Sequence, residues 1–512
     1  MLRAAAGLAL ILYCAAITGC EVFLPAVGGE GQSCFDNLTC KQDLMCVDGV
    51  CRARFEPDGG DGGDGADDGD AAAGDDGGPG DAGVEPDGDG FIPACAVGET
   101  RCQERVLQRC VEPGEWQDDH RCNVGCNAAQ NECLKVVDIA AGHSHTCAVI
   151  SDGRVLCWGN NGEGQLGIGT FGNGTIPPAQ VFNLAGAPLA GARRVALSSK
   201  NSCALHQDNS VSCWGSNVKG ECAISPAGGI LFSAQKVSGL VMEELVGGTW
   251  VSMGAIAADL HGSYWGCALL GESCWDNQNY YTSPHSIPGL ENLRSLCLGG
   301  DHACGLVDVN GSTEVRCFGR NAEGQLGNAS LNWQSSQTPV KVDNSDGWSG
   351  LGCSNGATFA WGPSGAYSWG NNSAGGVLGN ASVEDYKQQS PGPLLLRDEF
   401  DHPLPVRSIR GGMRHACAEV EAGGGLVSIY CWGYSLHGQV GASVLGEMAK
   451  YARPQLVLNL PPVRKLGVGW EHNCVILEDD ETVKCWGYNN LGAVNGLSLP
   501  ENTSLPLPVT FP

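Results

Sequence analysis

The chain has 512 residues, 27 of them cysteine, and a formal net charge of -27. Such an excess of acidic side chains disfavours binding to the phosphate backbone of nucleic acids. The 77 glycines and 25 prolines favour turns and strands over long helices, and the length leaves room for several domains.

Residues 1–19 have the pattern of a bacterial lipoprotein signal peptide. Arg3 precedes an apolar run that ends in Ile17-Thr18-Gly19-Cys20, and this run is shorter than the ~20 residues that span a bilayer. We therefore expect a cleaved signal, with Cys20 lipidated; an ordinary secretory signal is the alternative. Glu21 follows Cys20, at the position where an aspartate often signals retention of a lipoprotein in the inner membrane of bacteria. By resemblance, the protein is expected in the cell envelope, on the outer membrane or cell surface.

Residues 20–55 form a small cysteine-rich module. A segment of this size cannot bury a core, so we expect two disulfides, whose pairing the spacing leaves open. Zinc is the competing interpretation, but the segment has neither histidine nor a Cys-x-x-Cys motif. The four cysteines are Cys34, Cys40, Cys46 and Cys51.

Residues 56–92 form an acidic linker with thirteen Asp or Glu, no Lys or Arg, and mostly Gly and Ala besides. Such a composition cannot build a core, and we expect a disordered, extended spacer. Asp58-Gly59-Gly60-Asp61 and Asp87-Gly88-Asp89-Gly90 have a carboxylate spacing that calcium loops use. They lack the bidentate glutamate and flanking helices of an EF-hand, so calcium binding stays an alternative.

Residues 93–134 form a second cysteine-rich module around Trp116. Six cysteines within so short a segment predict three disulfides. These are Cys95, Cys102, Cys110, Cys122, Cys126 and Cys133.

Residues 135–512 contain an internal repeat. In its first copy, two short apolar segments flank the turn Ser151-Asp152-Gly153, which predicts a β-hairpin. Trp158-Gly159 and the box Gly164-Gln165-Leu166-Gly167 follow. The Trp-Gly step recurs every 43 to 63 residues, a length that suits one propeller blade per repeat. Its further copies are Trp214-Gly215, the degenerate Trp275-Asp276, Phe318-Gly319, Trp369-Gly370, Trp432-Gly433 and Trp486-Gly487.

These motifs closely resemble the repeats of the regulator of chromosome condensation family, whose units carry a Gly-x-x-His segment, a Trp-Gly step and a Gly-Gln-Leu-Gly box. Gly324-Gln325-Leu326-Gly327 matches the box fully. The resemblance implies an all-β fold, a seven-bladed β-propeller preceded by the two disulfide-rich modules and the linker. It says little about function, because members of the family differ in activity.

Cysteines recur in the predicted hairpins. In an antiparallel hairpin centred on Asp152, Cys147 faces Cys157 at a distance suited to a disulfide. Buried free thiols are the alternative. The fifth repeat has Phe359 and Ser368 instead. The six expected pairs are Cys147 with Cys157, Cys203 with Cys213, Cys267 with Cys274, Cys304 with Cys317, Cys417 with Cys431 and Cys474 with Cys485.

Three cysteines fall outside these pairs. Cys297 and Cys353 precede the hairpins of adjacent repeats and could bridge two blades, which would leave Cys222 as a buried thiol. Because the total is odd, one cysteine stays unpaired unless chains are cross-linked.

Closure of the ring is expected to use the C-terminus. Pro506-Leu507-Pro508-Val509 resembles the last strand of a repeat, and no such strand precedes Val137. We therefore expect this terminal strand to pair into the blade of the first repeat.

The recurrent histidines and tryptophans are expected to be structural. A histidine occupies one repeat position in four copies, and by resemblance it braces strands; an ion site is the alternative. No motif of a catalytic nucleophile, of a nucleotide-binding loop or of a cofactor site is present. The four histidines are His145, His302, His415 and His472.

These observations favour a surface-anchored binding or scaffold lipoprotein rather than an enzyme. Its propeller loops would recognise a protein or glycan, the membrane would be reached through the lipid, and no nucleic acid and no cofactor are expected. We expect a monomer. The alternative is an exported hydrolase or lyase with a site at the propeller axis.

Overall fold

The computed structural model describes residues 44–47, 50–53, 95–250, 252–269, 279–372, 375–397, 401–442 and 449–512. The chain divides into two compact units, 1–89 and 90–512. In the first, β1 (Leu44–Val47) and β2 (Val50–Ala53) form a hairpin with Cys46 opposite Cys51. The expected signal peptide, the lipidated Cys20 and the acidic linker lie outside the described residues.

The second cysteine-rich module is a three-stranded antiparallel sheet of β3 (Thr100–Gln103), β4 (Val106–Glu112) and β5 (Glu115–Arg121). Its few buried side chains are largely cysteines, so covalent links replace the missing apolar core. Three disulfides join Cys95 to Cys110, Cys102 to Cys126 and Cys122 to Cys133.

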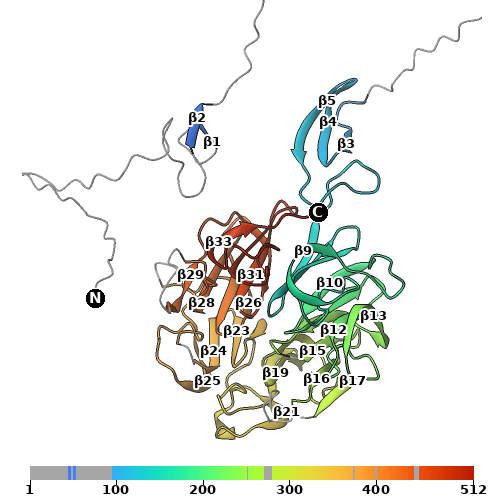
Figure 1. Ribbon diagram of the computed structural model, residues 1–512. Coiled ribbons are helices and arrows are strands. Elements are labelled where there is room, and N and C mark those ends of the chain that lie inside the picture. Colours follow the sequence, from blue (N-terminus) through green and yellow to red (C-terminus); the bar gives the residue numbers. More distant parts are fainter. Residues whose placement is uncertain are drawn as a thin grey trace, which may run out of the picture. The chain divides into compact units, whose positions relative to one another are not determined.

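The rest of the described chain folds into seven antiparallel sheets of four strands, each in sequence order (Figure 1). Sheet 1 has β6 (Val136–Ala141), β7 (His145–Ile150), β8 (Val155–Asn161) and β9 (Gly172–Gln180). Sheet 2 has β10 (Ala192–Leu197), β11 (Asn201–His206), β12 (Ser210–Ser216) and β13 (Ile230–Val241). Sheet 3 has β14 (Glu244–Gly247), β15 (Ser252–Ile256), β16 (Gly262–Cys267) and β17 (Tyr280–Ser286).

Four further sheets complete the fold. Sheet 4 has β18 (Leu293–Leu298), β19 (His302–Val309), β20 (Ser312–Gly319) and β21 (Ser336–Lys341), with the short 3-10 helix η1 (Ala329–Leu331) before β21. Sheet 5 has β22 (Gly350–Cys353), β23 (Ala357–Gly362), β24 (Gly365–Asn371) and β25 (Lys387–Pro393). Sheet 6 has β26 (Val406–Gly411), β27 (His415–Glu421), β28 (Val427–Tyr434) and β29 (Lys450–Leu456). Sheet 7 has β30 (Val463–Val468), β31 (His472–Leu477), β32 (Val483–Tyr488) and β33 (Asn502–Pro508).

The repeated tryptophan ties six of the sheets to the preceding one, and sheet 4 has Phe318 in its place. Trp214 is fully buried, and its Nε1–H donates to the backbone carbonyl of Gln165, in the Gly-Gln-Leu-Gly box of sheet 1, at 2.9 Å. The glycine after the tryptophan is required because of its positive φ and close backbone contacts: a Cβ on Gly159 would lie 2.6 Å from the Ser144 carbonyl oxygen. Equivalent bonds join Trp369 to Gln325, Trp432 to Val377, Trp486 to Gln439 and Trp158 to Ala493.

Sheet 3 corrects the position of one repeat. Trp275-Asp276 was the expected copy because Cys274-Trp275 has the Cys-Trp order of the other copies, but this prediction was wrong. Trp265 faces Met253 across β15 and β16, and its Nε1–H donates to the Glu221 carbonyl at 2.9 Å. Gly266 has a φ of +87°, as in the other copies. Trp265-Gly266 is therefore the third copy, and Trp275 lies outside the described residues.

Disulfides cross five of the hairpins, with Cα atoms 4.0 to 4.1 Å apart. In sheet 5, Phe359 faces Ser368. In sheet 3, Gly254 and Tyr264 hold the equivalent cross-strand positions, and the pairing of Cys267 with Cys274 stays a prediction. Cys267 is nevertheless disulfide-bonded, and Cys274 lies outside the described residues. The five pairs are Cys147–Cys157, Cys203–Cys213, Cys304–Cys317, Cys417–Cys431 and Cys474–Cys485.

Of the three remaining cysteines of the propeller, two form a disulfide and one is a free thiol. Cys297 of β18 is bonded to Cys353 of β22, with Cα atoms 5.5 Å apart, and this disulfide links sheets 4 and 5. Cys222 is a buried free thiol. Burial raises its pKa well above the ordinary value, so the thiol stays protonated at neutral pH.

The C-terminal strand does not pair into the sheet of the first repeat, so that prediction was wrong. β33 pairs with β32 of its own sheet, with Leu507 opposite Cys485, because each repeat begins with the strand before its Gly-x-x-His and uses its own fourth strand. Sheet 7 instead packs against sheet 1, where β30 and β31 contact β6 and side chains of both sheets share one core. The rings of Trp158 and Phe511 meet edge-to-face in this shared core, with their centres 5.9 Å apart.

Candidate functional site

A cavity of about 360 Å³ runs between the first strands of all seven sheets, β6, β10, β14, β18, β22, β26 and β30. We call it the axial cavity. Small residues make room for it: Ala140, Gly352 and Gly467 hold equivalent places along their strands. The backbones of neighbouring first strands approach closely there, since a Cβ on Gly467 would lie 3.3 Å from the Ile139 carbonyl oxygen.

The beginning of these strands carries charge. Asp138 is buried, pairs with Lys465, and accepts a hydrogen bond from the Val195 backbone N–H at 2.8 Å. These contacts join sheets 7, 1 and 2. Burial lowers the pKa of Lys465 to about 8, which leaves the ammonium charged at neutral pH. The exposed side chains of Arg194 and Arg410 also line the cavity, so its wall is mixed in charge.

At the other end of the axial cavity, three aromatic side chains lie together. The rings of His143 and Trp470 lie 3.9 Å apart, and those of Trp250 and Trp470 lie 5.0 Å apart. Trp470 Nε1–H donates to the Thr249 carbonyl at 2.6 Å, a bond between sheets 7 and 3. Burial, helped by Lys200, lowers the pKa of His143 to about 4. The side chains that line this end of the axial cavity are therefore uncharged near neutral pH.

The four repeat histidines act between sheets rather than around an ion. His145 Nε2 lies 2.9 Å from Ser202 Oγ of the next sheet, and His472 Nε2 lies 2.9 Å from Thr146 Oγ1 across the closing junction. His302 contacts Thr358, and His415 contacts Asn473, in the same way. Burial is the main cause that lowers the pKa of each, to about 3 or 4. They are neutral braces of the junctions.

Metal ligation finds no support in the described part of the chain. The three clusters of possible ligands there each contain disulfide-bonded cysteines, among them Cys102, Cys297 and Cys133. A disulfide sulfur is not a thiolate and is a poor ligand for zinc.

Exposed aromatic residues lie on one end of the propeller. The loops between first and second strands and between third and fourth strands share this end in an antiparallel sheet, and we call it the loop face. Phe171 and Phe232 stack there with ring centres 5.0 Å apart, and their exposed fractions are 58% and 39%. Trp333, also on a third-to-fourth loop, is 39% exposed. Aromatic side chains that stay in water are typical of recognition surfaces.

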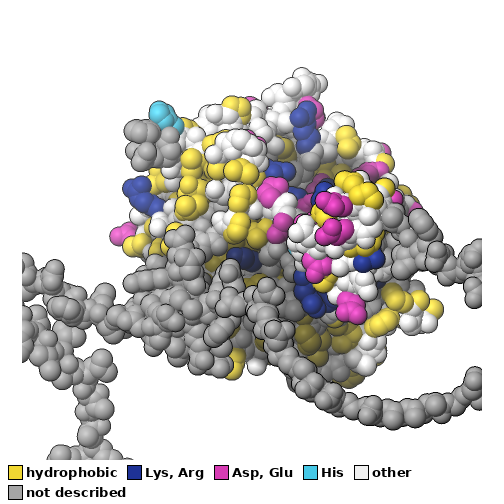
Figure 2. Space-filling model, turned by 90° about the horizontal axis from the view of Figure 1, so that it is seen from above, with side chains coloured by type: hydrophobic (Ala, Val, Ile, Leu, Met, Phe, Trp, Pro, Cys, Tyr) yellow, Lys and Arg dark blue, Asp and Glu magenta, His cyan; other side chains and the backbone are white. Residues whose placement is uncertain are grey.

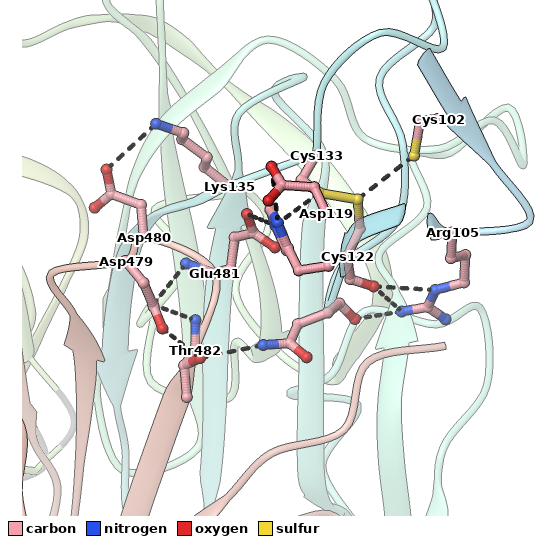
Figure 3. A network of polar contacts seen from close by, with 12 residues as sticks. Cys102, Arg105, Asp119, Cys122, Cys133, Lys135, Asp479, Asp480, Glu481 and Thr482 are labelled. Carbon is pink, nitrogen blue, oxygen red and sulfur yellow. Dashed lines mark hydrogen bonds and ion pairs between the residues drawn. A yellow bond between two sulfur atoms is a disulfide. The ribbon is translucent and has the colours of Figure 1, made fainter. Parts of the chain in front are cut away.

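The second cysteine-rich module contacts the opposite end, at the turn between β31 and β32 (Figure 3). His120 Nε2 lies 3.1 Å from Glu481 Oε1, and Asn123 Nδ2 donates to Thr482 Oγ1 at 3.1 Å. Arg105 Nη1 donates to the Phe511 carbonyl at 3.3 Å. The module thus holds the end of the chain at the closing junction and leaves the loop face open.

Charge on the face drawn in Figure 2 is mixed. Acidic side chains are interspersed there with basic and hydrophobic ones, without a continuous basic surface.

Sequence reasoning found some of these residues and missed others. The histidines and tryptophans recur with the repeat, so their structural role follows from the pattern. Trp250 and Trp470 meet across the axis from sheets 3 and 7, and Phe171 and Phe232 meet from sheets 1 and 2. Trp250, Trp470 and Phe171 lie in loops that vary between repeats, and Phe232 lies at the start of β13, so no periodic signal marks any of them.

Comparisons with known proteins agree with this fold. Models of the regulator of chromosome condensation repeat match residues 136–165, 192–221 and 463–493, and a second such model matches 152–205. Prp20p from Saccharomyces cerevisiae superimposes with a TM-score of 0.57 at 19% identity, over 73% of this chain and 87% of that one.

Two curated proteins are similar to parts of this chain. The ultraviolet-B receptor UVR8 of Arabidopsis thaliana is 25% identical over 394 residues, 74% of this chain and 70% of the receptor. The probable E3 ubiquitin-protein ligase HERC6 of Homo sapiens is 29% identical over 205 residues, 38% of this chain. The match spans only 19% of HERC6.

Within the described ranges, no helix combines the length and apolarity needed to cross a bilayer.

Proposed function

From a chain that carries regulator of chromosome condensation repeats folded as a β-propeller, we propose that this protein is a surface-anchored lipoprotein whose loop face binds a protein or glycan. In this proposal the seven four-stranded sheets serve as the blades of the propeller. The lipid on Cys20 tethers the chain, and the acidic linker, extended by self-repulsion, separates the propeller from the membrane.

The observation that carries this proposal is the exposed aromatic stack of Phe171 and Phe232. Two phenyl rings held in water lose no packing on binding and gain apolar contact, at roughly 25 cal/mol per Å² of apolar area buried. The rigid sheets on which they sit limit the entropy cost of recognition. Protein binding also occurs among structural relatives: Prp20p binds Gsp1p and histones.

A binding role is favoured over catalysis. The match to HERC6 covers a fifth of that ligase, so ligase activity is not carried over with the repeats. The axial cavity is lined by small residues and by the Asp138–Lys465 pair, which joins sheets 1 and 7, and its aromatic end is neutral. The partner is expected to be found outside the cell or in the envelope, where the disulfides are stable.

Replacing Cys20 tests the anchor. In the Cys20→Ser variant the acyl chains cannot be attached, and we expect the protein to move from the membrane fraction to the soluble fraction. Fractionation followed by mass spectrometry of the N-terminal peptide measures this. Cys222→Ser is the matched control and should stay in the membrane. Equal membrane partitioning of wild type and Cys20→Ser, with no acyl adduct on the wild type, would contradict the proposal.

Capture at the loop face identifies the partner. A photoreactive phenylalanine analogue placed at Phe171 of the full chain is expected to cross-link a discrete envelope or medium component. The same analogue at Leu426, an exposed residue in a turn at the opposite end, is the control. Cross-linking that is equal at both positions would reject a specific loop face.

A further inference from the structure

A serine and a histidine of sheet 2 form a hydrogen-bonded pair outside the axis. Ser212 lies on β12, and His206 ends β11, and both side chains point to the same face of the sheet. His206 Nε2 is 2.9 Å from Ser212 Oγ, and His206 Nδ1 is 3.1 Å from the carbonyl oxygen of Ala190. The chain thus brings together a hydroxyl, an imidazole and a third group that orients the imidazole, which is the arrangement of an activated nucleophile.

The carbonyl group fixes the tautomer of the histidine. A carbonyl oxygen only accepts hydrogen bonds, so Nδ1 of His206 carries the proton and donates it. Burial, the largest cause, lowers the pKa of His206 below its ordinary value, which favours the neutral ring at pH 7. Nε2 then holds a lone pair, and the hydroxyl of Ser212 must donate to it. The serine is therefore placed for removal of its proton.

This pair faces a pocket of about 600 Å³ between the loop 183–191 and strands β12 and β13. Leu184 and Leu189 give the wall apolar area. Lys236 lies directly opposite Ser212 in the pairing of β12 with β13, and its ammonium group forms an ion pair with Asp208 at 3.6 Å. The pocket that Ser212 lines therefore also carries an ion pair.

We propose that Ser212 is a nucleophile that accepts the acyl group of small esters with apolar acyl chains, with His206 as its base. Ser212 Oγ forms a bond to the acyl carbon while its proton passes to His206 Nε2. The ester C–O bond then breaks, and the leaving oxygen takes that proton. Water, deprotonated by the same nitrogen, releases the acid and restores the serine. This chemistry is independent of the loop face.

Covalent labelling of the full, oxidised chain tests the proposal. An alkyl fluorophosphonate should form one Ser212 adduct with loss of fluoride, and p-nitrophenyl butyrate should be hydrolysed. Ser212→Ala should abolish both. His206→Gln, whose amide can contact Ser212 but cannot take its proton, should lower the labelling rate on the order of 100-fold or more. His261→Gln, an exposed histidine in sheet 3, should label at the wild-type rate.

The labelling results support or overturn the proposal once each variant is shown to be folded. Unchanged thermal unfolding and an intact Cys203–Cys213 bond show that a variant keeps sheet 2. An unlabelled wild type, a label on another residue, or equal labelling of His206→Gln and wild type would overturn the proposal. Loss of labelling in both site variants, with their folding preserved, would establish it.

Discussion

Lowering the pH from 7 to 5 is expected to destabilise the propeller by about 8 kcal/mol, because four buried histidines brace its blade junctions. In the folded state their pKa values lie near 3 or 4, whereas unfolded histidine has a pKa near 6.5. The unfolded chain therefore takes up protons first as the pH falls. Stability is greatest above pH 6.5 and is lost as the pH falls toward the folded pKa values.

The expected size follows from the same values. Each histidine contributes about 2 kcal/mol between pH 7 and pH 5, and typical domains are stable by 5–15 kcal/mol. Acid unfolding should therefore begin while most carboxylates are still ionised. Denaturant unfolding at pH 7, 6 and 5 measures the slope.

A single substitution separates this mechanism from general acid effects. His302→Gln can still contact Thr358 but binds no proton, so its unfolding should take up nearly one proton fewer at pH 5. His261→Gln removes an exposed histidine, with a side chain 54% exposed, and should keep the wild-type slope. A free energy of unfolding that is the same at pH 7 and pH 5 would show that the histidines are not neutral braces.

Phe511→Ala is expected to destabilise the protein by about 3–5 kcal/mol, the usual cost of removing a buried phenylalanine. Phe511 is 2% exposed and packs on Trp158 in the core shared by sheets 7 and 1. Its loss leaves a cavity at the junction where the ring closes, and a propeller depends on every junction.

Thermal and denaturant unfolding of the full oxidised chain measure this effect. Removal of Pro512 alone, an exposed residue beyond Phe511, is the control and should change little. A stability of Phe511→Ala within about 1 kcal/mol of wild type would mean that the junction is closed without this residue.

Local patterns made much of the fold predictable. The hairpin around Ser151-Asp152-Gly153 and the buried Trp158 follow from turn chemistry and a repeated step. The bridge between Cys297 and Cys353 was reached by exclusion of the hairpin pairs. These inferences need only the sequence near each element, together with the count of cysteines.

Other features depended on information that the sequence pattern does not carry. Cys274-Trp275 imitated the repeat more closely than Trp265-Gly266 did, because sheet 3 lacks the hairpin cysteines. The terminal strand was assigned to the first sheet because the sequence does not show with which strand a repeat begins. Each repeat in fact begins with the strand before its Gly-x-x-His segment. The partner that orients His206 is the backbone carbonyl of Ala190, and a backbone carbonyl has no signature in residue type.

The most direct test of the account is the affinity of the captured partner for loop-face variants of the full chain. Phe171→Ser combined with Phe232→Ser should weaken binding at least about tenfold, since two exposed rings lose their apolar contact. Leu426→Ser, which removes a comparably exposed apolar side chain at the opposite end, should bind as wild type does. Equal affinity of the double variant and wild type would contradict the claim that the loop face is the binding surface.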